Sequence, residues 1–134
     1  MTEPRPILLV EDSPDDVEFA LLALREAGID APVDVAGDGE AAVAYLARTR
    51  PRLVILDLKI PKLGGFDVLA RIRADDRTRH VPVVIFSSSD VPEDVVRAYD
   101  LGANSYVRKP VEFDRYADAV GRVGRYWLEV NYGV

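Results

Sequence analysis

The hydrophobic residues of this chain form five short apolar runs, separated by segments in which apolar residues recur at helical spacing. The runs cover residues 7–10, 33–36, 53–56, 83–86 and 105–107. Strands that alternate with helices predict βαβ units and a parallel sheet, so the expected fold class is α/β. The first, third and fourth runs are nearly continuous in Ile, Leu and Val, which is typical of strands covered on both faces. We therefore expect these three strands at the centre.

Local signals predict where the intervening helices begin and end. Ser13 as a cap, Pro14 in the first turn and Asp16 facing back predict one helix start, and Gly28 predicts its end. Further helices are expected from near Asp38, after Gly64 and Gly65, between Asp90 and Glu93, and from about Glu112. The last helix carries an apolar stripe that we interpret as core: Phe113, Tyr116, Val120, Val123 and Trp127.

Composition limits the class of protein. The chain has 134 residues, of which 49% are hydrophobic and 30% charged, and it contains no cysteine. We interpret residues 1–134 as one domain with an aromatic-rich tail at about 126–134. No apolar run approaches the roughly 20 residues of a membrane span, so we expect a cytoplasmic protein. A net charge of −6 argues against direct nucleic-acid binding and favours protein partners.

Polar side chains follow four of the five predicted strands. Glu11 and Asp12 follow the first strand, Asp57 ends the third, Ser87 closes the fourth and Lys109 comes just after the fifth. Ligands of open parallel sheets bind beyond the carboxyl ends of the strands, at a topological switch point. If the strand order is 2-1-3-4-5, the first and third strands are neighbours, and Asp12 lies beside Asp57.

Carboxylates gathered in this way require compensation. Two like charges about 4 Å apart repel by roughly 4 kcal/mol at an effective dielectric of 20, so either one holds a proton or a cation lies between them. Oxygen ligands without His or Cys favour a hard ion such as Mg²⁺. A metal, a lysine and a hydroxyl around one carboxylate suit phosphoryl transfer, with Asp57 as the nucleophile.

Four sequence stretches carry a family resemblance: LLVEDS (8–13), VILDLKIPKLGG (54–65), VIFSSS (84–89) and DLGANSYVRKP (100–110). With these motifs the chain resembles the receiver domain of two-component response regulators. The resemblance implies a flavodoxin-like (βα)5 fold with strand order 2-1-3-4-5 and Asp57 as phosphoacceptor. It also implies Mg²⁺, with Mn²⁺ as a substitute, bound by Asp12, Asp57 and the backbone carbonyl of Lys59, with Glu11 acting through a water.

The same resemblance implies a switch. Lys109 would contact one phosphoryl oxygen, Ser87 would hydrogen-bond another and shift towards it, and Tyr106 would turn inward into the released space. Output would pass through the surface of the fourth helix, fifth strand and fifth helix, which includes Tyr99 and Tyr106. A cis Lys109–Pro110 bond is also implied, although only about 5–6% of X-Pro bonds are cis.

A narrower resemblance concerns the turn PKLGG (61–65) and the segment YWLEVNY (126–132). Both are similar to single-domain regulators that pair with phytochrome-type histidine kinases. The implied partner is therefore a histidine kinase, with a bacteriophytochrome as the specific candidate. The apolar side chains of this segment exceed what one helix end needs for packing, so we predict a homodimer through the last helix or tail. They are Tyr126, Trp127, Leu128, Val130 and Tyr132. The alternative is that Trp127 simply covers the edge of the core.

Three other functions fit the sequence less well. A phosphatase of the haloacid dehalogenase type expects a second Asp two positions after the nucleophile, where this chain has Lys59. A flavin-binding module is disfavoured because Glu11 and Asp12 would repel a phosphate. A non-phosphorylated adaptor would keep the fold without the chemistry, yet every expected site residue is present. No phosphate-binding loop for ATP occurs, and we expect no turnover of external substrates.

Overall fold

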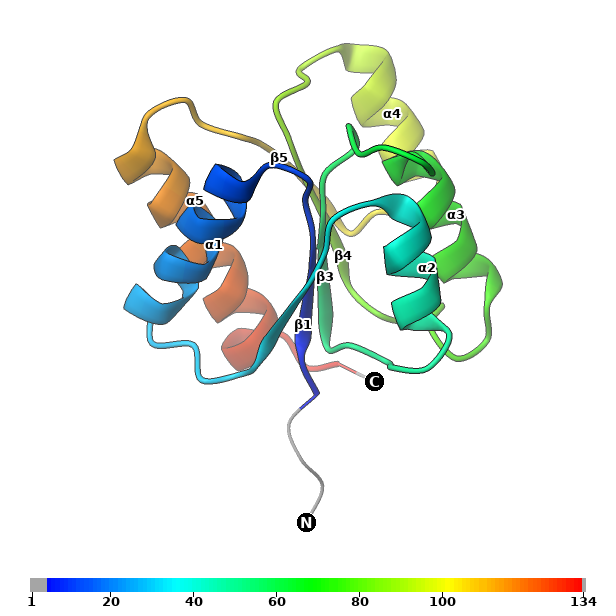
Figure 1. Cartoon of the computed structure of the whole chain (residues 1–134), viewed down its shortest axis with the longest axis horizontal. Helices are drawn as coiled ribbons and strands as arrows, with labels where there is room; N and C mark the ends of the chain where they lie inside the picture. Colours follow the sequence, from blue (N-terminus) through cyan, green and yellow to red (C-terminus); the bar gives the residue numbers. More distant parts are fainter. Residues whose placement is uncertain (1–4, 134) are drawn as a thin grey trace.

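The strands form where the apolar runs predict them. The computed structural model describes residues 5–133 and contains β1 (Ile7–Val10), β2 (Val33–Ala36), β3 (Leu53–Leu56), β4 (Val83–Ser87) and β5 (Ser105–Arg108). All neighbouring pairs are parallel, and the order is β2-β1-β3-β4-β5, which confirms the predicted flavodoxin-like sheet (Figure 1). The strands β4 and β5 each extend one residue beyond the predicted run.

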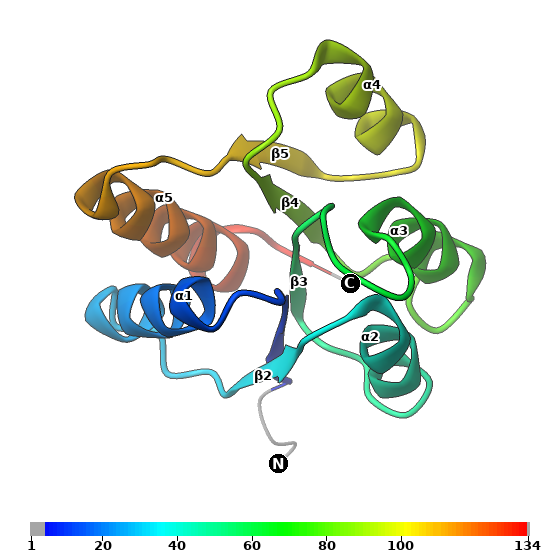
Figure 2. The same cartoon turned by 45° about the horizontal axis from the view of Figure 1, so that its top comes forward.

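Five helices cover the two faces of the sheet. The helices α1 (Pro14–Glu26) and α5 (Phe113–Arg125) lie on one face. The opposite face carries α2 (Gly39–Leu46), α3 (Gly65–Ala74) and α4 (Pro92–Asp100), as Figure 2 shows. A short π-helix, η1 (Tyr126–Val130), continues α5. Within residues 5–133, no helix has both the length and the apolar character needed to cross a membrane.

The predicted helix signals act locally as expected. The Ser13 hydroxyl accepts a hydrogen bond from the Asp16 backbone N–H at 3.4 Å, and Pro14 occupies the first turn of α1. Gly28 follows α1 with a φ of 80°, a left-handed conformation that glycine adopts without strain. Helix α4 begins at Pro92, between Asp90 and Glu93 as predicted.

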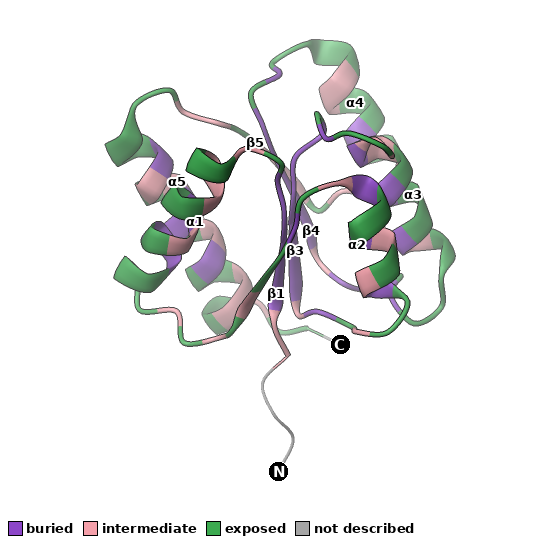
Figure 3. Ribbon diagram, in the orientation of Figure 1, coloured by how far each residue is buried: buried purple, intermediate pink, exposed green. Residues whose placement is uncertain are grey.

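The core consists of two layers separated by the sheet. Every residue of β1, β3 and β4 is buried, which confirms their predicted central position (Figure 3). On the face of α1 and α5, Tyr116 and Val120 are buried, and Trp127 packs against this layer while partly buried. Phe113 departs from the predicted core stripe. It is 39% exposed, and its ring contacts that of Phe19 edge to face with centroids 5.0 Å apart.

Candidate functional site

The carboxyl ends of the central strands bring the predicted polar residues together at the upper edge of the sheet in Figure 1. Backbone hydrogen bonds continue past the strand ends and fix the loops that carry the side chains. The Asp57 N–H donates to the Val10 carbonyl at 3.1 Å, which ties the end of β3 to β1. The Lys109 N–H donates to the Ser87 carbonyl at 2.7 Å, which ties the end of β5 to β4. These side chains therefore start from rigid backbone.

Three carboxylates form an acidic cluster at this edge. Glu11, Asp12 and Asp57 each offer an oxygen, and the three oxygens lie within 4.8 Å of one another. Glu11 and Asp57 are buried, whereas Asp12 is exposed and leaves the cluster open to solvent. A donor set made of carboxylate oxygens fits a hard divalent cation, and this fit agrees with the expectation from sequence.

Lys109 supplies the compensating charge. Its ammonium nitrogen lies 2.9 Å from Asp57 Oδ2, 2.9 Å from Asp16 Oδ2 and 2.5 Å from Glu11 Oε1. Asp16 was not among the predicted site residues, because its spacing from Ser13 indicates helix capping. Its position could have indicated the role. Asp16 lies in the first turn of the helix that follows Glu11 and Asp12, and so at the same edge of the sheet as Lys109.

The charges in this cluster alter the proton affinities of its members. Burial raises the pKa of Glu11, and hydrogen bonds from Lys109 and from the Ser13 backbone N–H offset only part of that effect. Burial alone would lower the pKa of Lys109, but hydrogen bonds to Glu11, Asp16 and Asp57 raise it above its ordinary value. Lys109 is therefore a fixed positive charge throughout the physiological pH range.

Asp57 is held at both carboxylate oxygens. The Lys59 backbone N–H donates to Oδ1 at 3.0 Å, and Lys109 donates to Oδ2. The loop after Asp57 closes tightly against Gly65, whose N–H donates to the Leu58 carbonyl at 3.1 Å. A β-carbon on Gly65 would lie 2.6 Å from the Asp57 carbonyl oxygen, so the approach requires glycine. The position of Asp57 thus depends on the start of α3.

Ser87 and Tyr106, the two predicted switch residues, meet through Ser89. Ser87 is fully buried, and its hydroxyl accepts a hydrogen bond from the Ser89 N–H at 3.3 Å. The Tyr106 hydroxyl donates to the Ser89 carbonyl at 2.8 Å, and the Ser89 hydroxyl donates to Asp94 Oδ2 at 2.7 Å. Tyr99, 48% exposed on α4, accepts from the Tyr106 N–H at 3.1 Å. A continuous hydrogen-bonded path therefore joins β4, α4 and β5.

The prediction of a cis Lys109–Pro110 bond was wrong, because no peptide bond between residues 5 and 133 is cis. The trans form is favoured by about 0.5–1 kcal/mol for an X-Pro bond. With this bond trans, Lys109 reaches the carboxylates of Glu11, Asp16 and Asp57. The orientation of its side chain therefore does not require the rarer cis isomer.

The aromatic tail does not contribute to this edge. Tyr126 is 48% exposed and Tyr132 fully exposed, whereas Trp127 and Leu128 pack partly buried against the layer formed by α1 and α5. Trp127 therefore packs against the edge of the core. The exposed apolar side chains of the tail are Tyr126, Val130 and Tyr132.

The sequence of the chain resembles known proteins over most of its length. The family described as the response regulator receiver domain matches residues 7–121. The probable methanogenesis regulatory protein FilR2 of Methanothrix harundinacea is 36% identical over 135 residues, covering 96% of this chain and 87% of that protein. Response regulator Rcp1 of Synechocystis is 35% identical over 133 residues, covering 94% of this chain and 90% of that protein.

Solved structures give the same result at the level of the fold. The phosphorylated cyanobacterial phytochrome response regulator RcpA superposes with a TM-score of 0.93 at 32% identity, covering 98% of this chain and 99% of that one. The Mn²⁺-bound form of Rcp1 superposes with a TM-score of 0.92 at 33% identity, with the same coverage of 98% and 99%. The likeness therefore includes the segment after residue 121.

Proposed function

Because the chain belongs to the response regulator receiver domain family, and so to phosphorylation-driven two-component signalling, we propose that Asp57 is its phosphoacceptor. One observation carries the proposal: Asp57 is buried in a cluster with Glu11 and Asp12, and Lys109 donates to its Oδ2 at 2.9 Å. An exposed surface carboxylate has no such set of partners. The phosphoryl donor is the phosphohistidine of a histidine kinase.

In the transfer, an Asp57 carboxylate oxygen forms a bond to phosphorus while the phosphorus–nitrogen bond of the kinase breaks. The electron pair of that bond goes to the imidazole nitrogen, which takes up a proton from water, and the product is an acyl phosphate. Lys109 stabilises the negative charge spread over the phosphoryl oxygens, and the Ser87 hydroxyl donates to a second oxygen. The partly buried Lys109–Asp57 pair supports these roles, because solvent screens its charges less than it screens exposed charges.

We further propose Mg²⁺ as the metal, with Mn²⁺ able to replace it, held by Asp12, Asp57 and the Lys59 backbone carbonyl, and by Glu11 through water. When bound, the cation supplies neutralising charge to the transferring phosphoryl group. The all-oxygen donor set supports a hard ion, and the related Rcp1 has been solved with Mn²⁺. Exposed Asp12 gives the ion a route of entry.

The switch that we propose uses the path through Ser89. As the Ser87 hydroxyl moves towards the phosphoryl group, it releases the Ser89 N–H that it now accepts from. The Ser89 carbonyl and hydroxyl hold Tyr106 and Asp94, so the change reaches β5 and α4 together. Phosphorylation then shifts the population of surfaces formed by α4, β5 and α5, including Tyr99.

The proposed kinase partner is a photoreceptor of the phytochrome type, such as a bacteriophytochrome. The fold match to RcpA, a phytochrome response regulator, extends over 98% of this chain and supports this choice. We also propose a homodimer through the tail, supported by the exposure of Tyr126, Val130 and Tyr132. Signalling occurs through protein contacts and without turnover of an external substrate.

Intact-mass measurement after incubation with acetyl phosphate and Mg²⁺ tests the phosphoacceptor. We expect wild type to gain one phosphoryl group, and both Asp57→Asn and a chelator-treated sample to gain none. Asp67→Asn, at an exposed carboxylate in the first turn of α3, is the matched control and should label as wild type does. Unlabelled wild type would favour the adaptor, and steady hydrolysis of a phosphate ester would favour the phosphatase.

A further inference from the structure

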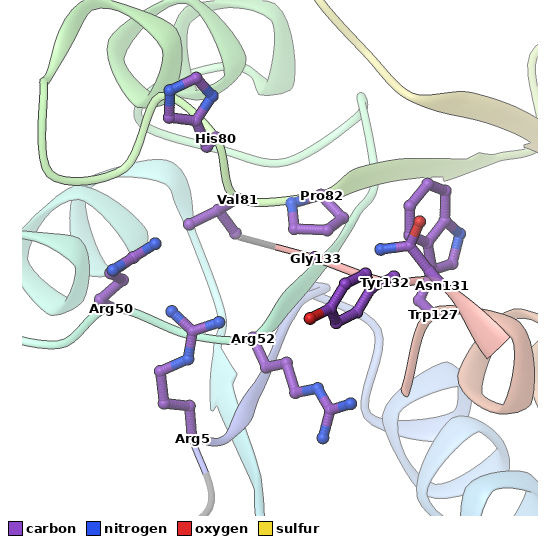
Figure 4. A pocket seen from close by; sticks show the side chains of 10 residues that line it. All are labelled: Arg5, Arg50, Arg52, His80, Val81, Pro82, Trp127, Asn131, Tyr132 and Gly133. Carbon is purple, nitrogen blue, oxygen red and sulfur yellow. The ribbon is translucent and has the colours of Figure 1, made fainter. Parts of the chain in front are cut away.

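A cavity of about 240 Å³ lies at the amino ends of the strands, whereas Asp57 lies at their carboxyl ends. Figure 4 shows the side chains that line it. Arg5 precedes β1, Arg52 directly precedes β3, and Arg50 lies two residues before Arg52. Trp127 of η1 and Asn131 of the tail line the cavity from another segment of the chain. The cavity therefore joins the starts of two central strands to the C-terminal segment.

The lining of this cavity is positively charged although the chain carries a net charge of −6. Three arginines and His80 line it, and no Asp or Glu among the described residues does so. The guanidiniums of Arg5, Arg50 and Arg52 form no ion pair with any carboxylate of residues 5–133. Other arginines do form such pairs, for example Arg122 with Asp118 at 2.9 Å.

The three charges affect one another. Burial lowers the pKa of Arg5, and the nearby positive charges of Arg50 and Arg52 lower it further. An anion placed among them would remove this repulsion and accept hydrogen bonds from the guanidiniums. Arg52 already donates to the Leu128 carbonyl, so it is fixed in place and links β3 to η1.

We propose that this cavity binds a small phosphate-bearing anion between Arg5, Arg50 and Arg52. Guanidinium groups offer paired N–H donors that match two oxygens of a phosphate. Three positive charges also favour an anion with more than one negative charge, such as phosphate, over a singly charged carboxylate. The volume of about 240 Å³ is below the range of roughly 300–1,000 Å³ for drug-sized ligands, which favours a compact anion.

Occupancy of the site has a structural consequence. Asn131, Tyr132 and Gly133 line the same cavity as the arginines, so an anion held there contacts both the strand starts and the tail. Binding stabilises the position of the tail, because the anion binds only when the tail lies against the arginines at the strand starts. The site is separate from Asp57 and requires neither metal nor phosphorylation.

The single tryptophan of the chain, Trp127, lines the cavity and gives a site-specific readout. Inorganic phosphate and then pyrophosphate are titrated into the full chain carrying Asp57→Asn, in chelator and at constant ionic strength, while tryptophan fluorescence is followed. We expect a saturable change, with pyrophosphate binding more tightly than phosphate. Acetate serves as the carboxylate arm and should give no saturable change.

Variants complete the test. Arg50→Gln changes an exposed residue and should weaken phosphate binding roughly tenfold or more, since it removes one of the three charged donors to the anion. Arg25→Gln, an exposed arginine of α1 outside the cavity, makes the same charge change and should bind as the parent does. No saturable response, equal binding by the Arg50→Gln and Arg25→Gln chains, or an equal response to acetate would overturn the proposal.

Discussion

The ammonium nitrogen of Lys109 lies 2.9 Å from Asp16 Oδ2, which joins the first turn of α1 to the end of β5 across 93 residues of sequence. The same nitrogen also holds Asp57 and Glu11. Asp16 is thus a third carboxylate on the lysine that we assign to phosphoryl transfer. It holds the Lys109 side chain from α1 while Asp57 holds it from the end of β3, and we interpret Asp16 as a positioning residue.

Asp16→Asn should leave the fold intact and lower the free energy of unfolding by about 1 kcal/mol or less, as for other partly exposed ion pairs. The rate of phosphorylation by acetyl phosphate should fall a few-fold, because Lys109 is less well positioned. Asp15→Asn is the control: Asp15 lies in the same helical turn, is exposed and forms no ion pair within residues 5–133. Equal effects of the two variants would point to the helix dipole instead.

Divalent metal should stabilise the folded chain. If Mg²⁺ binds the carboxylate cluster only in the folded state, a free concentration 100 times its Kd raises the free energy of unfolding by about 2.7 kcal/mol. Urea unfolding with and without Mg²⁺ measures this difference. Asp12→Asn should reduce it, while Asp114→Asn, in the first turn of α5, should not. A metal effect of the same size in wild type and Asp12→Asn would contradict the proposed ligands.

Adjacent glycines at the start of α3 should respond differently to alanine. A β-carbon at Gly65 would lie 2.6 Å from both the Asp57 carbonyl oxygen and Leu58 Cα, whereas one at Gly64 meets nothing within 4 Å. We expect Gly65→Ala to lower the free energy of unfolding by about 1–3 kcal/mol, as overpacking does, and to slow phosphorylation by displacing Asp57. Gly64→Ala should be near neutral in both measurements. Two variants with the same stability would show that the loop relaxes freely.

The central strands β1, β3 and β4 were predictable because strands buried on both faces are nearly continuous in apolar residues. All five predicted runs lie within strands of the structure, and the strands β1, β2 and β3 match to the residue. The site followed from this, since the residues after each strand must share one edge. Asp16 escaped prediction because it has a complete local explanation: its N–H does donate to Ser13. Only the tertiary fold brings its carboxylate to Lys109.

Two other errors have physical causes. The isomer of the Lys109–Pro110 bond was inferred from the family, and a preference of about 0.5–1 kcal/mol is too small for sequence alone to settle. Phe113 has the spacing of a core residue, yet it lies at the first position of α5 and is not among the residues packed in the buried layer under α1 and α5. Its ring therefore contacts exposed Phe19 instead of the core.

Tyr116 gives a prediction about alkaline pH. Its hydroxyl donates to the Asp16 carbonyl at 3.1 Å, and burial followed by the charge of Asp16 raises its pKa. The folded chain therefore keeps the phenol proton where the unfolded chain has lost it. The resulting stabilisation is complete below the unfolded pKa of about 10 and is lost as the pH rises through the folded value.

Tyr116→Phe should lower the free energy of unfolding at pH 8 by about 1 kcal/mol, the usual contribution of one hydrogen bond. The difference between wild type and variant should shrink from pH 8 to about pH 10.5, because only wild type carries this titration. Urea unfolding of both proteins across this interval measures it. Other alkaline titrations, including that of Lys109, are common to both proteins and cancel. A difference that stays constant or grows would contradict the raised pKa of Tyr116.

The exposed face of the tail should control self-association. Tyr126 and Val130 are 48% and 68% exposed on η1, and their burial against a second copy would remove apolar surface from water. We expect a Tyr126→Ser/Val130→Ser double variant to shift sedimentation towards monomer at concentrations where wild type dimerises.

Leu22→Ser is the control, because Leu22 is a 38% exposed apolar residue of α1 far from the tail in sequence. Trp127 stays unchanged, because it packs against the core and its loss would destabilise the fold. Wild type that sediments only as monomer at high concentration, with and without a phosphoryl analogue, would reject the dimer, and dissociation by Leu22→Ser alone would place the interface on α1.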